Sequence, residues 1–261
     1  MRRRNFSRTI GIDYSGAATP EKGLTGLRVY CAGIDGAPQE IRPFDDPRRH
    51  WSRRSLAAWL AQTLQTPEPT LVGIDHGFGF PRAWFQAHDV APDWEAFLAD
   101  LPADYPTDQA GVSVEAVRRG RIGHGARRPG NARWRRAAEE RVGAKSVFHF
   151  DVPGSVAKST HAGLPWLARL RHTPGLNLHI WPFDGWQIPP GCSAVAEIYP
   201  SLWSANYPRG SRTPDQHDAY VVAAGLAAAD GNGELGALLQ PSLDTTTRQR
   251  AQLEGWILGV G

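Results

Sequence analysis

The sequence predicts a single α/β domain built on a mixed sheet flanked by helices. Two short apolar runs, residues 9–13 and 70–74, have the length and β-branched content of buried strands. Between them, Leu56, Leu60 and Leu64 recur at helical spacing, and the prolines that follow end the helix. This strand, helix, strand order implies a crossover, so the second strand should lie parallel to an earlier one.

The chain is expected to open with three antiparallel strands. Residues 27–34 and roughly 38–44 read as two further strands, joined by Asp35-Gly36, a dipeptide typical of tight hairpins. With 261 residues the chain is long enough to bury a core, and its two cysteines have neither a disulfide framework nor zinc-site spacing. We expect a cytoplasmic protein with no export or membrane segment.

The second half predicts a helix at residues 164–172, strands near 176–182 and 194–199, and a strong last helix. That helix begins at Thr213 with an N-cap, a proline in the first turn and a capping-box glutamine. Small apolar residues then form one stripe along it, which favours close packing on a sheet. Residues 78–154 show weaker patterning and are interpreted as an inserted or irregular segment of the same domain.

Carboxylates stand at the places where chemistry is expected. Asp13 and Asp75 end apolar strands, Glu197 interrupts another, and Asp215 and Asp218 occupy the first turns of the last helix. Converging carboxylates repel one another unless a cation compensates them, and Mg²⁺ or Mn²⁺ prefers oxygen ligands. We therefore predict Asp13, Asp75, Glu197, Asp215 and Asp218 as metal ligands, with Asp13, Asp75, Glu197 and Asp218 as the catalytic set.

Each acid also has a simpler interpretation. Strand-end aspartates often cap turns, Glu197 could pair with an arginine, and Asp215 suits a helix start because of the helix dipole. His76 and His217 adjoin predicted ligands and could assist proton transfer, although an isolated histidine is more often structural. The convergence of several acids is what favours a site.

A basic segment suggests a polyanionic partner. Residues 116–145 hold ten Arg or Lys against two Glu, whereas the whole chain carries a net charge of only +3. Nucleic acid, DNA or RNA, is the predicted partner, and the alternative is a solvated arginine-rich loop. The predicted contact residues are Arg127, Arg128, Arg133, Trp134, Arg135, Arg136, Lys145 and Lys158.

Several segments resemble a bacterial and archaeal family known as domain of unknown function 429. They are Ile10-Gly11-Ile12-Asp13, Val72-Gly73-Ile74-Asp75, Gly154-Ser155-Val156-Ala157-Lys158-Ser159, Ala196-Glu197-Ile198-Tyr199-Pro200, Asp215-Gln216-His217-Asp218-Ala219 and Glu254-Gly255-Trp256-Ile257. The resemblance implies a ribonuclease H-like fold and a metal-dependent nuclease. This chain departs from the family pattern at Pro81-Arg82-Ala83-Trp84, where many members carry an Arg-x-Cys-Asp-like stretch. The resemblance therefore does not determine the substrate specificity of this chain.

Two other functions stay open on the sequence alone. The turns after Asp13 and Asp75 are similar to the phosphate-binding turns of actin-like phosphotransferases, but a duplicated domain and a glycine-rich nucleoside site are not evident. A nucleic-acid-binding scaffold without catalysis is the third possibility. Two-metal phosphodiester hydrolysis remains the leading hypothesis.

Overall fold

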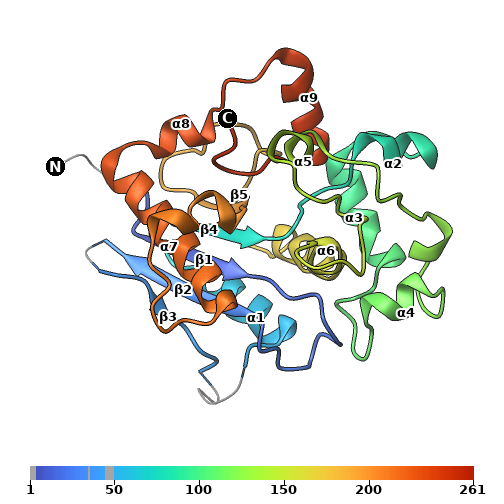
Figure 1. Cartoon of the computed structure of the whole chain (residues 1–261), viewed down its shortest axis with the longest axis horizontal. Helices are drawn as coiled ribbons and strands as arrows, with labels where there is room; N and C mark the ends of the chain where they lie inside the picture. The colour runs from blue at the N-terminus through green and yellow to red at the C-terminus, as the bar shows by residue number, and fades with distance from the viewer. Residues whose placement is uncertain (1–3, 35, 45–49) are drawn as a thin grey trace.

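The computed structural model describes residues 4–34, 36–44 and 50–261, and it shows a mixed six-stranded sheet with helices on both faces (Figure 1). The strand order is β3-β2-β1-β4-β6-β5. The strands are β1 (Arg8–Asp13), β2 (Arg28–Gly33), β3 (Gln39–Glu40), β4 (Thr70–Asp75), β5 (Leu178–Trp181) and β6 (Ser193–Glu197). The α/β class and the mixed sheet are therefore confirmed.

The pairing follows the sequence prediction closely. Strands β1, β2 and β3 are antiparallel neighbours, whereas β1, β4, β6 and β5 are parallel to one another. β3 is shorter than the predicted strand 38–44 and ends at Glu40. The predicted hairpin dipeptide includes Asp35, which lies outside the described residues.

The helices divide between the two faces of the sheet. They are α1 (Arg53–Leu64), α2 (Arg82–Ala87), α3 (Trp94–Asp104), α4 (Val114–Arg118), α5 (Ala137–Val142), α6 (Ala157–Arg171), α7 (Pro214–Asn232), α8 (Leu235–Leu239) and α9 (Thr245–Glu254), with short 3-10 turns at Gly125–Arg127, Pro200–Leu202 and Ser204–Asn206. α7 packs on β1, β2 and β4, and α1, α3 and α6 share the main core on the opposite face. None of the helices in the described part has the length and apolar character that a bilayer crossing requires.

The segment 78–154 is more ordered than its sequence pattern suggests. It contributes four helices, and the rings of Phe80, Trp84 and Phe97 pack together in the main core. α3 from this segment packs against α6. α6 itself begins seven residues before the predicted start, and Pro165 lies inside it. The segment is thus part of the body of the fold.

Candidate functional site

Two aspartates lie side by side at the carboxyl ends of β1 and β4. These strands are parallel neighbours, and Asp13 is the register partner of Asp75. Nearly all the residues before them in β1 and β4 are buried, and several are β-branched, as is typical of central parallel strands. Because side chains alternate along a strand, both carboxylates project to the face on which α7 packs.

A pair of glycines allows α7 to approach that face closely. Gly11 and Gly73 are also register partners, and a Cβ at Gly11 would lie 2.1 Å from the carbonyl oxygen of Ala219. A Cβ at Gly73 would lie 2.7 Å from Val222. α7 runs antiparallel to β1, since Thr9 at the other end of the strand donates a hydrogen bond to the carbonyl of Ala223 at 2.8 Å. The first turns of α7 therefore meet the strand ends.

This packing brings the helix acids to the strand acids. Asp215 lies in the first turn of α7, beside the loop that contains Gly26, and Asp218 follows one turn later. Thr213 caps the helix by accepting a hydrogen bond from the Gln216 amide, which fixes where the first turn begins. Asp13, Asp75, Asp215 and Asp218 thus form one cluster, hereafter the aspartate cluster.

Burial and mutual repulsion raise the pKa values in the aspartate cluster. Burial, then Asp75, Asp215 and Asp218, raises the pKa of Asp13 to about 9, against a smaller opposing effect of Arg28. Burial, then Asp218 and Glu197, raises the pKa of Asp75 to about 8. The pKa of Asp218 is raised by burial and by Asp215. The shifts show that the four carboxylates lie close enough together to disfavour one another's ionised forms.

The carboxylates of the aspartate cluster have unused coordinating capacity. Within the described residues, no hydrogen bond or ion pair reaches the side-chain oxygens of these four aspartates. Their chemistry suits a hard divalent cation. However, no three His, Cys, Asp or Glu side chains in that part of the chain are arranged to hold a metal ion as they stand. Metal binding would therefore need the carboxylates to rotate toward one another.

Glu197 lies close enough to Asp75 to raise its pKa, but both of its oxygens are bound by Arg136. Its two oxygens accept hydrogen bonds from the two terminal nitrogens of Arg136, each at 2.6 Å, and the Phe78 amide donates at 3.0 Å. This bidentate pair is fully buried, and Arg136 also bonds Glu139 through its Nε at 2.9 Å. The prediction of Glu197 as a catalytic residue and metal ligand is corrected, because its carboxylate is neutralised inside the fold.

Arg136 likewise has no part in a nucleic-acid surface. Its side chain is 1% exposed, and Glu197 and Glu139 hold its pKa above the ordinary arginine value although burial opposes them. The prediction of Arg136 as a phosphate contact is corrected for this reason. Arg127, Arg133 and Arg135 are exposed and form no ion pair within the described residues. Arg128 pairs with Asp104 at 3.3 Å, and Trp134 packs edge-on against Phe148.

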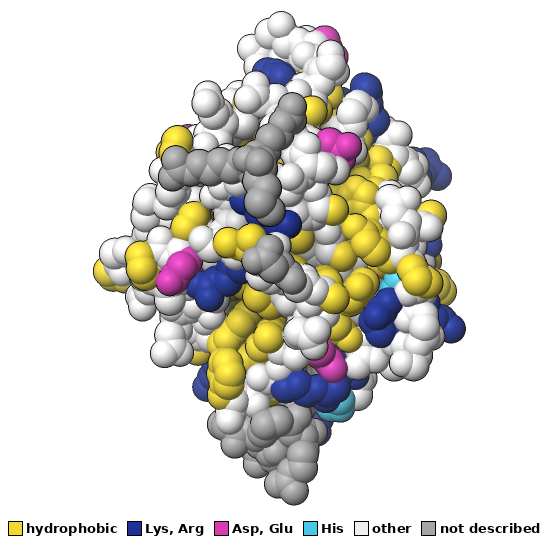
Figure 2. Space-filling view, turned by 90° about the vertical axis from the view of Figure 1, so that its left-hand side faces the viewer, with side chains coloured by type: hydrophobic (Ala, Val, Ile, Leu, Met, Phe, Trp, Pro, Cys, Tyr) yellow, Lys and Arg dark blue, Asp and Glu magenta, His cyan; other side chains and the backbone are white. Residues whose placement is uncertain are grey.

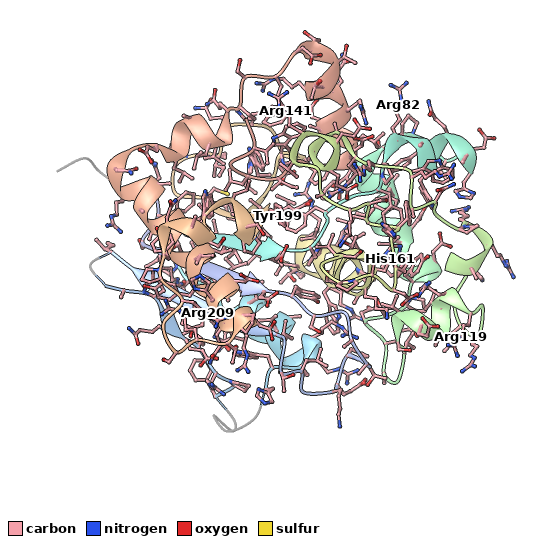
Figure 3. The ribbon with its side chains drawn as sticks, in the orientation of Figure 1. Arg82, Arg119, Arg141, His161, Tyr199 and Arg209 are labelled. Carbon is pink, nitrogen blue, oxygen red and sulfur yellow. The ribbon has the colours of Figure 1, made fainter. Side chains whose placement is uncertain are left out.

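Positive charge is spread more widely than the sequence segment suggests. Residues 116–145 lie on one side of the molecule in Figure 1, yet Figure 2 shows Lys and Arg side chains on the opposite side too. Figure 3 places Arg119 and Arg82 at the periphery, far from Arg209, which lies beside α7. The exposed arginines of the basic segment are therefore one of several basic areas on the surface.

Lys158 borders the loop after Asp13. A Cβ at Gly16 would lie only 2.0 Å from the carbonyl oxygen of Lys158, so the start of α6 packs directly against that loop. The Lys158 ammonium pairs with Asp151 at 2.9 Å and stays half exposed. Lys145 donates to the carbonyl of Pro153 in the adjoining loop. These two lysines thus lie together at the amino end of α6.

Sequence reasoning did not identify the arginines whose charges act on Asp13 and on His217. Arg28 is the register partner of Asp13 on β2, and it pairs with Glu40 at 3.1 Å. Arg209 and Arg212, together with burial, lower the pKa of His217, which adjoins Asp218. The available signal was two arginines within four residues before the capping box of an acid-bearing helix.

His76 does not suit the predicted role in proton transfer. His76 is buried with its Nδ1 2.9 Å from the carbonyl of Gly77, and burial lowers its pKa to about 4. It is therefore neutral near pH 7 and a weak base. Its ring faces Tyr14 at 4.7 Å rather than the aspartate cluster, because residues 14 and 76 follow the acids and alternate to the other face.

Comparisons of this chain with protein-family models, with curated proteins and with solved structures found no match. The resemblance to domain of unknown function 429 therefore stays a prediction from the motifs, and the site has to be interpreted from its own geometry.

Proposed function

We propose that this protein is a divalent-cation-dependent nuclease of a ribonuclease H-like fold, related to the domain of unknown function 429 proteins. The observation that carries the proposal is the aspartate cluster, in which two strand-end acids in register meet two acids from the first turns of a helix. The mixed sheet with an antiparallel β3-β2-β1 part supports the fold assignment.

The cluster has the ligand chemistry that Mg²⁺ or Mn²⁺ requires. Asp13, Asp75 and Asp218 would ligate the cations, and Asp215 would complete the ligand set. Bound cations would supply charge neutralisation, water activation and stabilisation of the leaving oxygen in phosphodiester cleavage. Arg28 forms an ion pair with Glu40, which partly neutralises its charge. Arg28 therefore lowers the pKa of Asp13 only slightly and does not replace a bound cation.

Nucleic acid is the proposed partner because exposed arginines are available to its phosphates. Arg127, Arg133 and Arg135 lack competing ion pairs within the described residues, and Trp134 stands among them. Lys158 and Lys145 add positive charge at the amino end of α6, which borders the loop after Asp13. Such a distribution would hold the backbone of a polyanion between the basic surface and the acids.

Cleavage of labelled single-stranded and double-stranded DNA and RNA, with Mg²⁺ or Mn²⁺ and with EDTA, tests the proposal. We expect cation-dependent cleavage, lost by at least 100-fold in Asp13→Asn, since removing a ligand charge disables a two-cation site. Asp100→Asn, an exposed aspartate on α3, is the matched control and should cleave normally. If no substrate is cleaved, or if Asp13→Asn cleaves at the normal rate, the nuclease assignment fails, and binding without cleavage would favour a scaffold.

A further inference from the structure

Two arginines stand at the ends of one tight turn just before α7. The amide of Arg212 donates a hydrogen bond to the carbonyl of Arg209 at 3.3 Å, so both side chains leave the same turn. Arg209 is exposed and lies beside α7 in Figure 3, and Arg212 is half-buried. Neither arginine pairs with a carboxylate in the part of the chain that the structure describes, so their charges are not neutralised there.

The Arg212 side chain is held in place by an aromatic ring. Its guanidinium carbon lies 3.7 Å from the centre of the Tyr220 ring, which is the geometry of a cation–π contact. One terminal nitrogen donates to the carbonyl of Pro208, and this hydrogen bond lies at the exposed surface. The Nε is buried, so a ligand would approach the terminal nitrogens. Arg212 is therefore fixed with the end of its guanidinium at the surface.

Tyr220 is itself fixed against the sheet. Its ring packs edge-on against Tyr30 of β2, with the ring centres 5.6 Å apart, and against Tyr207, with the centres 6.1 Å apart. Tyr30 is buried and is the register partner of Gly11 on β1. The contacts thus run from the sheet through Tyr220 to Arg212. Such support lowers the entropy that a long side chain loses when it binds a ligand.

The start of α7 places these arginines near the aspartate cluster. Arg212 precedes Asp215 by three residues, with the N-cap of the helix between them. Burial, then the charge of Arg212, lowers the pKa of His217, and Arg209 acts in the same direction. His217 adjoins Asp218, yet no ion pair joins either arginine to the cluster within the described residues. The arginines therefore flank the acids without neutralising them.

A nucleic acid bound at the aspartate cluster would extend past its point of attachment. Each strand of a duplex carries one phosphate per about 3.4 Å of helix axis, so further phosphates follow closely on both sides of one held at the cluster. The acids repel these phosphates, whereas an unpaired guanidinium attracts them and matches their oxygens well. One strand can thus use both the acids, through bound cations, and the arginines.

We propose that Arg212, supported by Tyr220 and joined by Arg209, binds a backbone phosphate that flanks the one held at the aspartate cluster. The inference rests on the proposed function for the identity of its ligand, a nucleic acid, and adds the residues that position it. A nucleic acid is favoured over an acidic peptide because a single strand then accounts for both the acids and the arginines.

Fluorescence anisotropy of labelled single-stranded and double-stranded oligonucleotides in EDTA tests the proposal on the full chain. We expect Arg212→Met to weaken binding at least fivefold and to lower the slope of log affinity against log salt by about 0.9 for a duplex. Arg248→Met is the matched control and should bind normally. Arg248 on α9 also lies over an aromatic ring, Trp186 at 4.5 Å, and also donates to a proline carbonyl. If no oligonucleotide binds, or if Arg212→Met binds as tightly as the unsubstituted chain, the proposal is overturned.

Substitutions at Tyr220 test whether its ring positions the arginine. Tyr220→Phe keeps the ring and should retain full affinity. Tyr220→Leu removes the ring and should weaken binding at least threefold although every charge remains, with folding checked by circular dichroism. Normal affinity in folded Tyr220→Leu would contradict the supporting role of this ring.

Cleavage in Mg²⁺ separates this inference from the nuclease assignment. Arg212→Met should raise KM at least fivefold with a smaller change in kcat, as expected for a residue that binds substrate. Cleavage that needs Asp13 but shows an unchanged KM in Arg212→Met would remove only the present inference. Binding that needs Arg212 without any cleavage would remove only the nuclease assignment. A labelled glutamate peptide that binds as tightly as the oligonucleotides would assign the surface to an acidic protein and overturn the inference.

Discussion

Asp13 and Asp75 are direct register partners on two parallel strands, so their carboxylates begin from neighbouring Cα positions at the same edge of the sheet. Two acids placed in this way repel each other, and α7 adds Asp215 and Asp218 to the same place. Such an arrangement destabilises the folded state unless a bound cation or a proton neutralises part of the charge.

The cation-free protein should lose stability as the pH rises. The folded pKa values, about 9 for Asp13 and about 8 for Asp75, lie above those of the unfolded chain. Between the unfolded and folded pKa values the folded state retains protons that the unfolded state has released, so the free energy of unfolding falls across that window. Urea unfolding in EDTA at a series of pH values from about 5 to 9 measures this slope.

Asp75→Asn removes one titrating carboxyl and should flatten the slope, raising stability near pH 8 in EDTA relative to the unsubstituted chain. Asp100→Asn should keep the original slope. Adding Mg²⁺ should restore stability to the unsubstituted chain more than to Asp75→Asn, because a cation that binds only the folded state stabilises it. Parallel slopes for all three chains would refute this account.

The close approach of α7 depends on Gly11. In Gly11→Ala the new Cβ meets the backbone of Ala219, which cannot move aside as a side chain tip could, so the helix must shift. We expect a loss of about 1–3 kcal/mol of stability, and a weaker affinity for Mn²⁺ because Asp215 and Asp218 move with the helix. Gly33→Ala, where nothing lies within 4 Å, is the control and should change neither quantity. Equal behaviour of the two variants would show that helix position is not limiting.

Adjacent arginines should differ sharply in their effect on stability. Arg136→Met leaves Glu139 and Glu197 buried without their cation and should cost about 3–5 kcal/mol in urea unfolding. Arg135→Met removes an exposed charge and should change stability by less than about 0.5 kcal/mol. Adding Glu197→Gln to Arg136→Met should recover part of the loss. A small effect of Arg136→Met would mean that this buried pair is not needed.

The exposed arginines should control salt dependence rather than catalysis. The double change Arg133→Glu and Arg135→Glu should weaken nucleic-acid binding and reduce the slope of log affinity against log salt by roughly 0.9 for each lost phosphate contact. Fluorescence anisotropy across a salt series measures this slope. Arg250→Glu, which removes an arginine paired with Glu140 and Glu254, provides a comparison outside the basic segment. An unchanged slope in the double variant would show that the segment is only solvated surface.

The sequence predicted the parts of the fold that local periodicity encodes. Residues 9–13 and 70–74 were recognisable as buried strands, and the crossover rule then placed Asp13 beside Asp75. The capping residues at Thr213 located α7, and the small residues along it indicated close packing. These features are local, so they are visible before tertiary structure forms.

Features that depend on distant partners were not predictable in the same way. Glu197 pairs with Arg136, which lies 61 positions away in the sequence. Nothing in the local sequence around either residue distinguishes this arginine from the exposed Arg135. The packing of α6 against the sheet depends on its early start and on Gly163, where a Cβ would lie 2.5 Å from His76. Such relationships arise from packing rather than from periodicity.

Anomalous diffraction from Mn²⁺-soaked crystals tests the central claim most directly. We predict Mn²⁺ between Asp13, Asp75 and Asp218, with carboxylate oxygens at roughly the 2.0–2.2 Å expected for small divalent cations. Glu197 should stay on Arg136 and make no contact with the ion. Manganese that binds elsewhere, or no anomalous peak among these aspartates at saturating concentration, would contradict the account.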